Sequence, residues 1–188
     1  MKTFLLSLTL IAILFTACTN NGSTNQASDS TATMEAIDQE TTVNKMPASE
    51  ILTGYLTLKN ALTTDNDKEA AAAATELSKS LKNMDKSSLN ADQLKVYNDV
   101  EADAREHADH IASNAGNLVH QREHFETLSA EVYELVKATG AGQKLYYTNC
   151  PMYNNNKGAN WLSETKEVKN PYLGMAMSTC GSVTEELN

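Results

Sequence analysis

Apolar residues recur at helical spacing through the middle of this chain and predict four helices. Between Ile51 and Leu62, large apolar residues return every three or four positions, which places them on one face of a helix. Three further stripes follow, and the second helix is built around the alanine run that starts at Ala70. The predicted helices span residues 48–63, 67–84, 90–113 and 118–139.

Short polar residues stand before these stripes, and glycines follow the last one. The Asp65–Asp67 stretch, Asn90 and Asn117 lie where a side chain can accept hydrogen bonds from the first free N–H groups of a helix. Gly140 and Gly142 follow the fourth stripe, as is common at helix ends. Because short loops join these amphipathic helices, we expect an up-down four-helix bundle.

The pattern changes in the C-terminal residues 143–188. Leu145–Thr148 is rich in β-prone residues, and Asn154–Gly158 is typical of a turn. Trp161 and Tyr172 are the expected core of this segment. The sequence therefore predicts a mainly α fold, a four-helix bundle that carries an irregular or short-β cap.

The first residues have the pattern of a bacterial lipoprotein signal. Lys2 precedes an apolar run from Phe4 to Phe15 that is too short to span a bilayer comfortably. Thr16–Cys18 ends this run with small residues and a cysteine. We expect residues 1–17 to be removed and Cys18 to be acylated, which would anchor the chain to the cell envelope, facing the periplasm. An ordinary secretory signal with an incidental cysteine is the alternative.

Composition limits the domain count and the partners. Residues 18–46 are expected to form a flexible tether, because most of them are small and polar and cannot bury apolar area. Residues 47–188 are enough for one domain with a single core. The net charge of -9 argues against nucleic acid as a partner, since its recognition needs clustered lysine and arginine.

The tail holds the strongest candidate for chemistry. If Cys18 is lipidated, Cys150 and Cys180 are the only thiols that remain, and Met152 and Met177 lie close to them in sequence. Thiolates and thioethers are the soft donors that select Cu(I) and similar ions such as Ag(I). The spacing predicts a soft-metal site made of these four residues, with Met175 as a weaker candidate.

The same two cysteines have a second interpretation. In an extracytoplasmic compartment a pair of cysteines often forms a disulfide. A Cys150–Cys180 disulfide would close a long loop and add a few kcal/mol of stability. The nearby methionines would then be flexible filler of the core. The sequence leaves both interpretations open.

The four histidines lie on the third and fourth predicted helices. His120 and His124 lie one turn apart at the edge of an apolar stripe, and this spacing is compatible with metal binding. His124 is a candidate ligand or neighbouring donor for the cysteine site, and His120 is a less favoured one. His107 borders the third stripe, whereas His110 points nearly opposite to it and is expected to be solvated.

Catalysis has little support in the sequence. Cys150 and His124 could be drawn as a nucleophile and its base, but no thiol-hydrolase pattern surrounds them, and the chain has no CxxC pair and no glycine-rich phosphate loop. We expect a protein that is not an enzyme; a thiol enzyme would have one cysteine of low pKa. Arg122 lies near the apolar face of its helix. A structural role, in a buried ion pair or a hydrogen bond to the tail, is the alternative to a functional role for this residue.

Several motifs together resemble an uncharacterised bacterial envelope domain. They are Gln121–Ser129, Cys150–Met152, Trp161–Ser163, Asn170–Gly174 and Met177–Gly181. Domains of this kind occur as lone lipoproteins in Bacteroidetes-type bacteria and as extensions of periplasmic adaptor subunits of copper and silver efflux pumps. The resemblance covers roughly residues 48–184 and is most specific in the tail.

The resemblance implies a helical domain with a link to metal handling. It places Cys150, Met152, Met177 and Cys180 at the soft donors of the motif, and His124 before its phenylalanine. We therefore expect a periplasmic lipoprotein domain that binds Cu(I) or Ag(I) and buffers the ion or passes it to an efflux system. A structural or protein-interaction module closed by a Cys150–Cys180 disulfide is the alternative.

Overall fold

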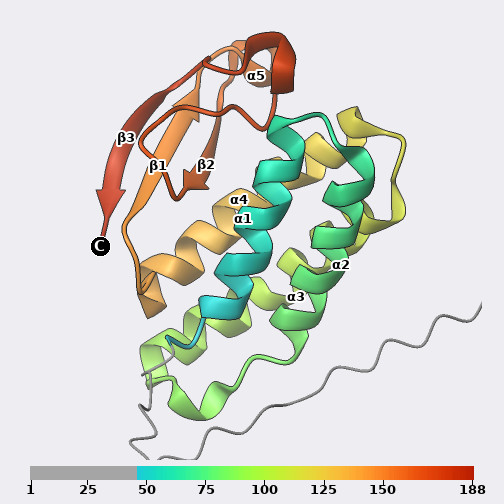
Figure 1. Cartoon of the computed structure of the whole chain (residues 1–188). Helices are drawn as coiled ribbons and strands as arrows, with labels where there is room; N and C mark the ends of the chain where they lie inside the picture. The colour runs from blue at the N-terminus through green and yellow to red at the C-terminus, as the bar shows by residue number, and fades with distance from the viewer. Residues whose placement is uncertain (1–45) are drawn as a thin grey trace, which may run out of the picture. The chain divides into compact units, whose positions relative to one another are not determined.

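Helices and a small sheet form the described part of the chain, residues 46–188 of this computed structural model (Figure 1). The predicted signal peptide, the lipidation site Cys18 and nearly all of the predicted tether lie outside the described residues. The four long helices are α1 (Ser49–Thr63), α2 (Asp67–Lys82), α3 (Ala91–Ser113) and α4 (Leu118–Thr139). Each begins and ends within two residues of the range read from the apolar stripes. None of the helices within residues 46–188 has the length and apolarity needed to cross a membrane.

Asparagines begin three of these helices. The side chain of Asn66 accepts the N–H of Glu69 at the start of α2. Asn90 and Gln93 bond reciprocally at the start of α3, which satisfies two N–H groups that the helix cannot bond itself. Asn117 accepts the N–H of His120 at the start of α4. These bonds explain why the helix starts could be read from sequence.

Helices that follow one another in sequence pack side by side. α1 lies against α2, α2 against α3 and α3 against α4, and α1 also contacts α4 (Figure 1). Gly54 permits the close approach of α1 to α2, because a β-carbon there would lie 3.2 Å from the Cα of Leu77. The short turn η1 (Lys86–Ser88) links α2 to α3.

The tail forms a three-stranded antiparallel sheet on one side of the helices. Its strands are β1 (Leu145–Cys150), β2 (Ala159–Ser163) and β3 (Ser182–Leu187), in the order β2-β1-β3. The β1–β2 link contains the short α5 (Tyr153–Asn156), and η2 (Gly174–Met177) precedes β3. The cap is therefore a small β-sheet with irregular connections.

The β1–β2 link has an unusual backbone, and the sequence accounts for it. Asn154, Asn155 and Asn156 all have positive φ, and Gly158 does too. Asparagine tolerates this left-handed region better than other side chains, and glycine has no side chain to clash. The predicted turn at Asn154–Gly158 is found where β1 meets β2, pairing Cys150 with Ala159.

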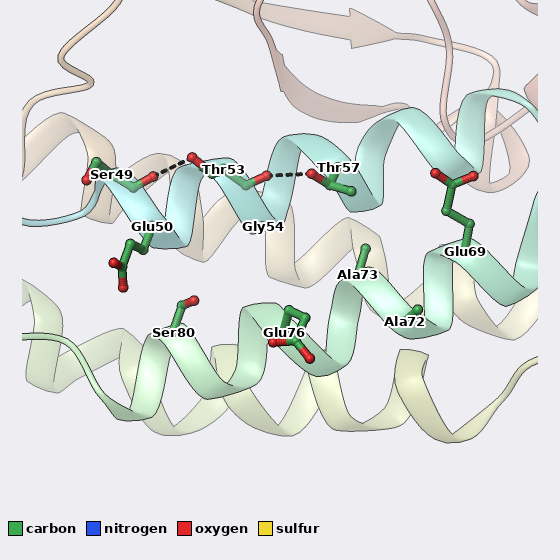
Figure 2. A pocket seen from close by; sticks show the side chains of 10 residues that line it. All are labelled: Ser49, Glu50, Thr53, Gly54, Thr57, Glu69, Ala72, Ala73, Glu76 and Ser80. Carbon is green, nitrogen blue, oxygen red and sulfur yellow. Dashed lines mark hydrogen bonds between the residues drawn. The ribbon is translucent and has the colours of Figure 1, made fainter. Parts of the chain in front are cut away.

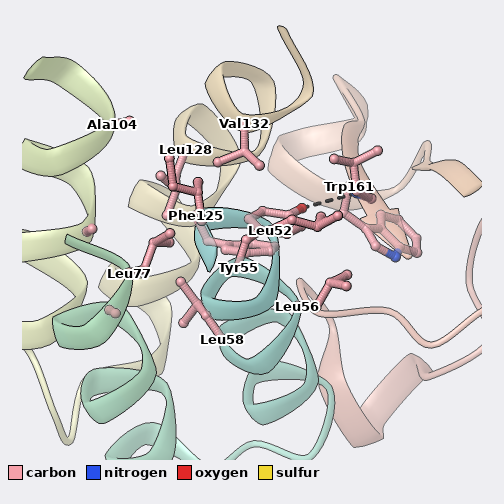
Figure 3. Packing of buried hydrophobic residues seen from close by; sticks show 14 of the residues in the cluster. Leu52, Tyr55, Leu56, Leu58, Leu77, Ala104, Phe125, Leu128, Val132 and Trp161 are labelled. Carbon is pink, nitrogen blue, oxygen red and sulfur yellow. Dashed lines mark hydrogen bonds between the residues drawn. The ribbon is translucent and has the colours of Figure 1, made fainter. Parts of the chain in front are cut away.

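Aromatic side chains join the sheet to the helices in one core (Figure 3). The rings of Tyr55 and Phe125 stack with centroids 5.3 Å apart, and Tyr172 lies 5.6 Å from Phe125. Tyr172 also meets the edge of Trp161. Trp161 and Tyr172 are both buried, which confirms them as core residues of the cap.

Polar contacts made by two side chains, Lys59 and Arg122, hold the cap against the helices. The buried ammonium of Lys59 lies 2.7 Å from the Glu164 carboxylate, just after β2. Arg122 on α4 donates to the carbonyl oxygens of Pro171 and Leu62 at 2.8 and 2.9 Å, and it forms an ion pair with Asp65. Arg122 thus links α4, the α1–α2 turn and the tail, which gives this residue a structural role.

Candidate metal sites

The two tail cysteines meet at one end of the sheet. Cys150 is the last residue of β1 and is buried, and Cys180 lies half-buried in the bend before β3. Their sulfur atoms are 2.9 Å apart, and both thiols are free. Asn170 donates to the carbonyl of Cys180 at 2.7 Å. A β-carbon on Gly181 would lie 2.7 Å from the carbonyl oxygen of Asn149, so only glycine fits where this bend passes β1.

The two thiols differ in acidity. Burial by itself raises the pKa of Cys150, but hydrogen bonds from Cys180, from the backbone N–H of Met152 and from Asn170 outweigh it, and the net shift of this pKa is downward. The hydrogen bond to Cys150 raises the pKa of Cys180, and burial adds to the rise. Cys150 is therefore the first of the pair to become a thiolate, with the Cys180 S–H as its donor.

The methionines beside the cysteines are exposed. Within residues 46–188, the exposed large apolar side chains are Val119 and three tail methionines, Met152, Met175 and Met177. Their exposed fractions are 50, 69 and 41 % for Met152, Met175 and Met177. The interpretation of these methionines as core filler is wrong, because their side chains lie at the surface.

The distance between the two sulfur atoms is longer than a disulfide bond and shorter than the separation expected for two thiolates on one metal ion. A disulfide needs about 2.05 Å. Two thiolates on one tetrahedral ion, with bonds of about 2.3 Å, would lie about 3.8 Å apart. The observed 2.9 Å is therefore a contact between two thiols that either event would change by about 1 Å.

All four histidines of the chain gather between α3 and α4. His107 and His110 come from α3, and His120 and His124 come from α4. His107 Nδ1 lies 2.9 Å from His124 Nδ1, and His124 Nε2 lies 3.2 Å from His120 Nε2. The ring of His110 stacks on that of His124 with centroids 4.4 Å apart.

The structure groups His124, which was predicted as a donor beside the cysteines, with the other histidines. Its ring contacts are with the three other histidines. Phe125, the next residue, is the one that faces the cap, where it contacts Tyr55 and Tyr172. Successive helical residues point about 100° apart, so Phe125 and His124 serve different faces of α4.

Sequence reasoning missed His110 as a member of this cluster. Its side chain is 47 % exposed, so the expected contact with solvent is found. A helical wheel places His110 relative to the apolar stripe of its own helix, but it contains no information on where α4 packs. The signal that was present is the spacing of His107 with His110 and of His120 with His124, since each pair lies on one helix face.

The histidine rings are poor bases in this setting. Burial lowers the pKa of His124, and the neighbouring histidines lower it further, while Glu123 opposes the shift. Burial also lowers the pKa of His107, against the charges of Glu106 and Asp103. Both rings are therefore neutral at pH 7, the form in which an imidazole binds a metal.

A surface hollow of about 630 Å³ lies along α1 and α2 (Figure 2). Its walls include small residues such as Gly54, Ala72 and Ala73, with Glu69 and Glu76 at its side. Glu76 is paired with Lys79, and Glu69 with the side chain of Asn66. This hollow contains none of the predicted site residues.

These features define a helical domain that carries candidate metal ligands in two places. Residues 51–144 match the family described as protein of unknown function (DUF3347), which is half of the chain, and the chain belongs to this family. No curated protein and no solved structure matches the chain. The family match includes all four histidines and ends before β1, so Cys150 and Cys180 lie outside it.

Proposed function

We propose that this protein binds a soft metal ion, Cu(I) or Ag(I), through Cys150 and Cys180. The observation that carries the proposal is the contact between two free thiols, 2.9 Å apart, beside exposed methionines. Thiolate and thioether sulfur are the donors that soft ions prefer. The domain would act without catalysis, by holding the ion and releasing it to a partner.

The acidity of the pair supports binding by exchange of a proton for a metal. Cys150 has the lowered pKa and accepts the S–H of Cys180. Binding of a monovalent soft cation by both thiolates releases the proton of each thiol, and the lowered pKa of Cys150 favours the first release. Metal binding by thiols releases protons for this reason.

The exposed methionines support a site that can be loaded and unloaded. A methionine side chain at the surface gives up the favourable burial of its apolar atoms. Met152 donates its backbone N–H to Cys150, and Met177 accepts the N–H of Cys180, so each is tied to a cysteine through its backbone while its thioether stays free. We infer that Met152 and Met177 complete the coordination, with Met175 as a substitute.

Nitrogen is absent from the ligand set that we propose for this site. His124 and His120 contact other histidines, so the ligands are sulfur only. A tetrahedral ion with four sulfur ligands and bonds of about 2.3 Å would hold the two cysteine sulfurs about 3.8 Å apart. The half-buried Cys180 is the side chain free to make this movement, since Cys150 is enclosed in the core.

A disulfide is the second candidate state of this pair, and the close contact of the sulfurs favours it in an oxidising compartment. It would make the tail a closed loop that supports a protein-interaction module. The two states exclude each other, because a disulfide leaves no thiolate for a metal. A thiol count on the purified, unreduced Cys18→Ser variant distinguishes them, with two reactive thiols expected for the metal site and none for the disulfide.

The test of the proposed function is an anaerobic titration with Cu(I) against a competing chromogenic chelator. We expect the Cys18→Ser chain to bind one ion with a dissociation constant below about 1 µM. The Cys18→Ser, Cys150→Ser, Cys180→Ser variant should lose this binding. Equal affinity in the two proteins, or no binding at micromolar concentration, would refute the proposal.

A second comparison tests the thioethers. Met152→Leu with Met177→Leu keeps the size and apolar character of the side chains and should weaken Cu(I) binding by about tenfold or more, about 1.4 kcal/mol, because it removes two proposed sulfur ligands. Met84→Leu is the matched control, because Met84 is a buried core residue. Equal loss in both variants would assign the effect to stability and not to coordination.

The setting that we propose is the bacterial envelope, with the chain anchored by lipid on Cys18 and facing the periplasm. The support is the signal pattern of residues 1–18 and the resemblance to domains found with metal efflux systems, whose components are the proposed recipients of the ion. We also propose that the helices form an up-down bundle, since consecutive helices pack together across short links. In bacteria fed labelled palmitate, Cys18→Ala should abolish labelling of the chain.

A further inference from the structure

We propose that His120 and His124 form a second metal site, with nitrogen ligands, that takes a divalent ion such as Cu²⁺, Ni²⁺ or Zn²⁺. His110 supplies a third ligand, and His107 and Glu123 orient the other rings. This site lies between α3 and α4 and is separate from the thiol pair. It goes beyond the proposed function, because it would hold a harder ion by different residues.

The distance between the two nearest nitrogens fits one ion. Nε2 of His124 and Nε2 of His120 are 3.2 Å apart. A metal with two nitrogen bonds of about 2.05 Å holds its ligands about 2.9 Å apart at a right angle and about 3.3 Å apart at a tetrahedral angle. The separation of the two nitrogens therefore already suits a shared ion.

Hydrogen bonds at the far side of each ring leave the Nε2 atoms of His120 and His124 free to bind. Nδ1 of His120 lies 3.2 Å from the carboxylate of Glu123, which can only accept, so this nitrogen carries the proton. Nδ1 of His124 lies 2.9 Å from Nδ1 of His107, and donates to it when His107 holds its own proton on Nε2. Both Nε2 atoms are then unprotonated and lie 3.2 Å apart with no proton between them, an arrangement that a bound cation would relieve.

This pattern of partners is the one that metal-bound histidines use. A ligating imidazole commonly donates its other N–H to a carboxylate or another acceptor, which fixes the ring and strengthens the ligand. Glu123 serves His120 in this way, and His107 serves His124. In a chance cluster of surface rings, we would not expect the Nδ1 atoms of both His120 and His124 to have such partners.

His110 completes three nitrogen donors. One ring nitrogen each of His110, His120 and His124 lies within 4.8 Å of the others. The ring of His110 is stacked nearly parallel to that of His124, at 11°, so it must turn to direct a lone pair at the ion. It has room to do so, since its side chain is 47 % exposed and borders an open hollow of about 560 Å³.

Charges around the cluster favour a cation. Glu106 lies 3.9 Å from His110, and Glu123 and Asp109 lie on the same two helices. Arg105 is the nearby positive charge on α3, and Glu101 neutralises it at 3.1 Å. The ion would therefore meet a negative surface around the rings.

The test uses Cu²⁺ on a chain without thiols, so that the sulfur site cannot contribute and cannot reduce the ion. We expect the Cys18→Ser, Cys150→Ser, Cys180→Ser variant to bind one Cu²⁺ below about 1 µM, with nitrogen hyperfine structure in its electron paramagnetic resonance spectrum. Adding His120→Ala and His124→Ala should weaken binding at least 100-fold. Adding His107→Phe, which keeps a ring but removes its acceptor, should weaken binding about 10–100-fold.

Matched measurements keep the two metal sites distinguishable. Glu76→Gln removes one negative charge from α2 and leaves every histidine in place, so it should not change the affinity. Equal Cu²⁺ affinity with and without His120 and His124 would overturn this inference and leave the thiol site untouched. If the serine variant does not fold, as judged by circular dichroism, Ni²⁺ titration of the wild-type chain and of its His120→Ala, His124→Ala variant decides the same question.

Discussion

Oxidation of Cys150 and Cys180 should stabilise the protein and remove its Cu(I) binding at the same time. The perturbation is oxidised glutathione, which takes two electrons from the two thiols and is itself reduced as their disulfide forms. The sulfurs start 2.9 Å apart, so closing the bond needs a shift of less than 1 Å. The Cys18→Ser chain is used so that no other thiol reacts.

The expected gain follows from the length of the closed loop. The two cysteines are 30 residues apart in sequence. Closing a loop of that length removes about 12 cal/mol/K of entropy from the unfolded chain, or about 3.6 kcal/mol at 25 °C. For a domain of this size, such a gain raises Tm by roughly 10 °C.

Thermal unfolding followed by circular dichroism, with and without reductant, measures the gain, and a Cu(I) titration of the same oxidised sample measures the loss. The Cys18→Ser, Cys150→Ser, Cys180→Ser variant is the control and should show no rise in Tm. An oxidised chain that is stabilised yet still binds Cu(I) as tightly as the reduced one would exclude these sulfurs as ligands. A chain that forms no disulfide would contradict the observed contact.

Three further predictions test the fold and one half-buried carboxyl group. Tyr55→Phe leaves the buried N–H of Leu162 without an acceptor and should cost about 1–3 kcal/mol in urea unfolding. Gly174→Ala should lower the free energy of unfolding by more than about 1 kcal/mol, because φ is 54° and the new methyl would collide with Asp65. Gly116→Ala is the control and should cost less, because Gly116 also has positive φ but lies in open space. An equal cost in the two variants would exclude the collision. Burial, with the charge of Asp103, raises the pKa of Glu131 to about 7. The contribution of Glu131 to stability should therefore fall as pH rises from about 4.5 through 7, whereas the lowered pKa values of His107 and His124 act in the opposite direction. Glu131→Gln should raise Tm relative to wild type more at pH 8 than at pH 4.5, and an equal difference in Tm at both pH values would contradict the shift.

Local signals made the helices and the β1–β2 turn predictable. Asn90 and Asn117 mark helix starts because their side chains bond the adjacent backbone, and this chemistry does not depend on the rest of the fold. The turn at Asn154–Gly158 was equally local, since it depends on residues that tolerate positive φ. Trp161 and Tyr172 could be assigned to the core because large aromatic residues lose most by exposure.

Long-range pairing made the rest unpredictable. β3 (Ser182–Leu187) is largely polar, and it is held by β1 and by Glu185, which bonds Tyr133 and Lys137 of α4 at 2.6 Å each. Nothing within the strand itself indicated these partners. The histidine cluster depends in the same way on the packing of α3 against α4, which a single helical wheel does not contain.

The burial of the tail aromatics against α1 and α4 has a consequence for where the folding unit ends. The family match stops at residue 144, yet the apolar face formed by Tyr55 and Phe125 is covered by Tyr172, beyond that limit. A fragment cut at the family boundary would expose this face to water and would be expected to aggregate or to recruit another apolar surface. The matched segment is therefore shorter than the cooperative unit, and a soluble fragment for biophysical work needs to extend through β3.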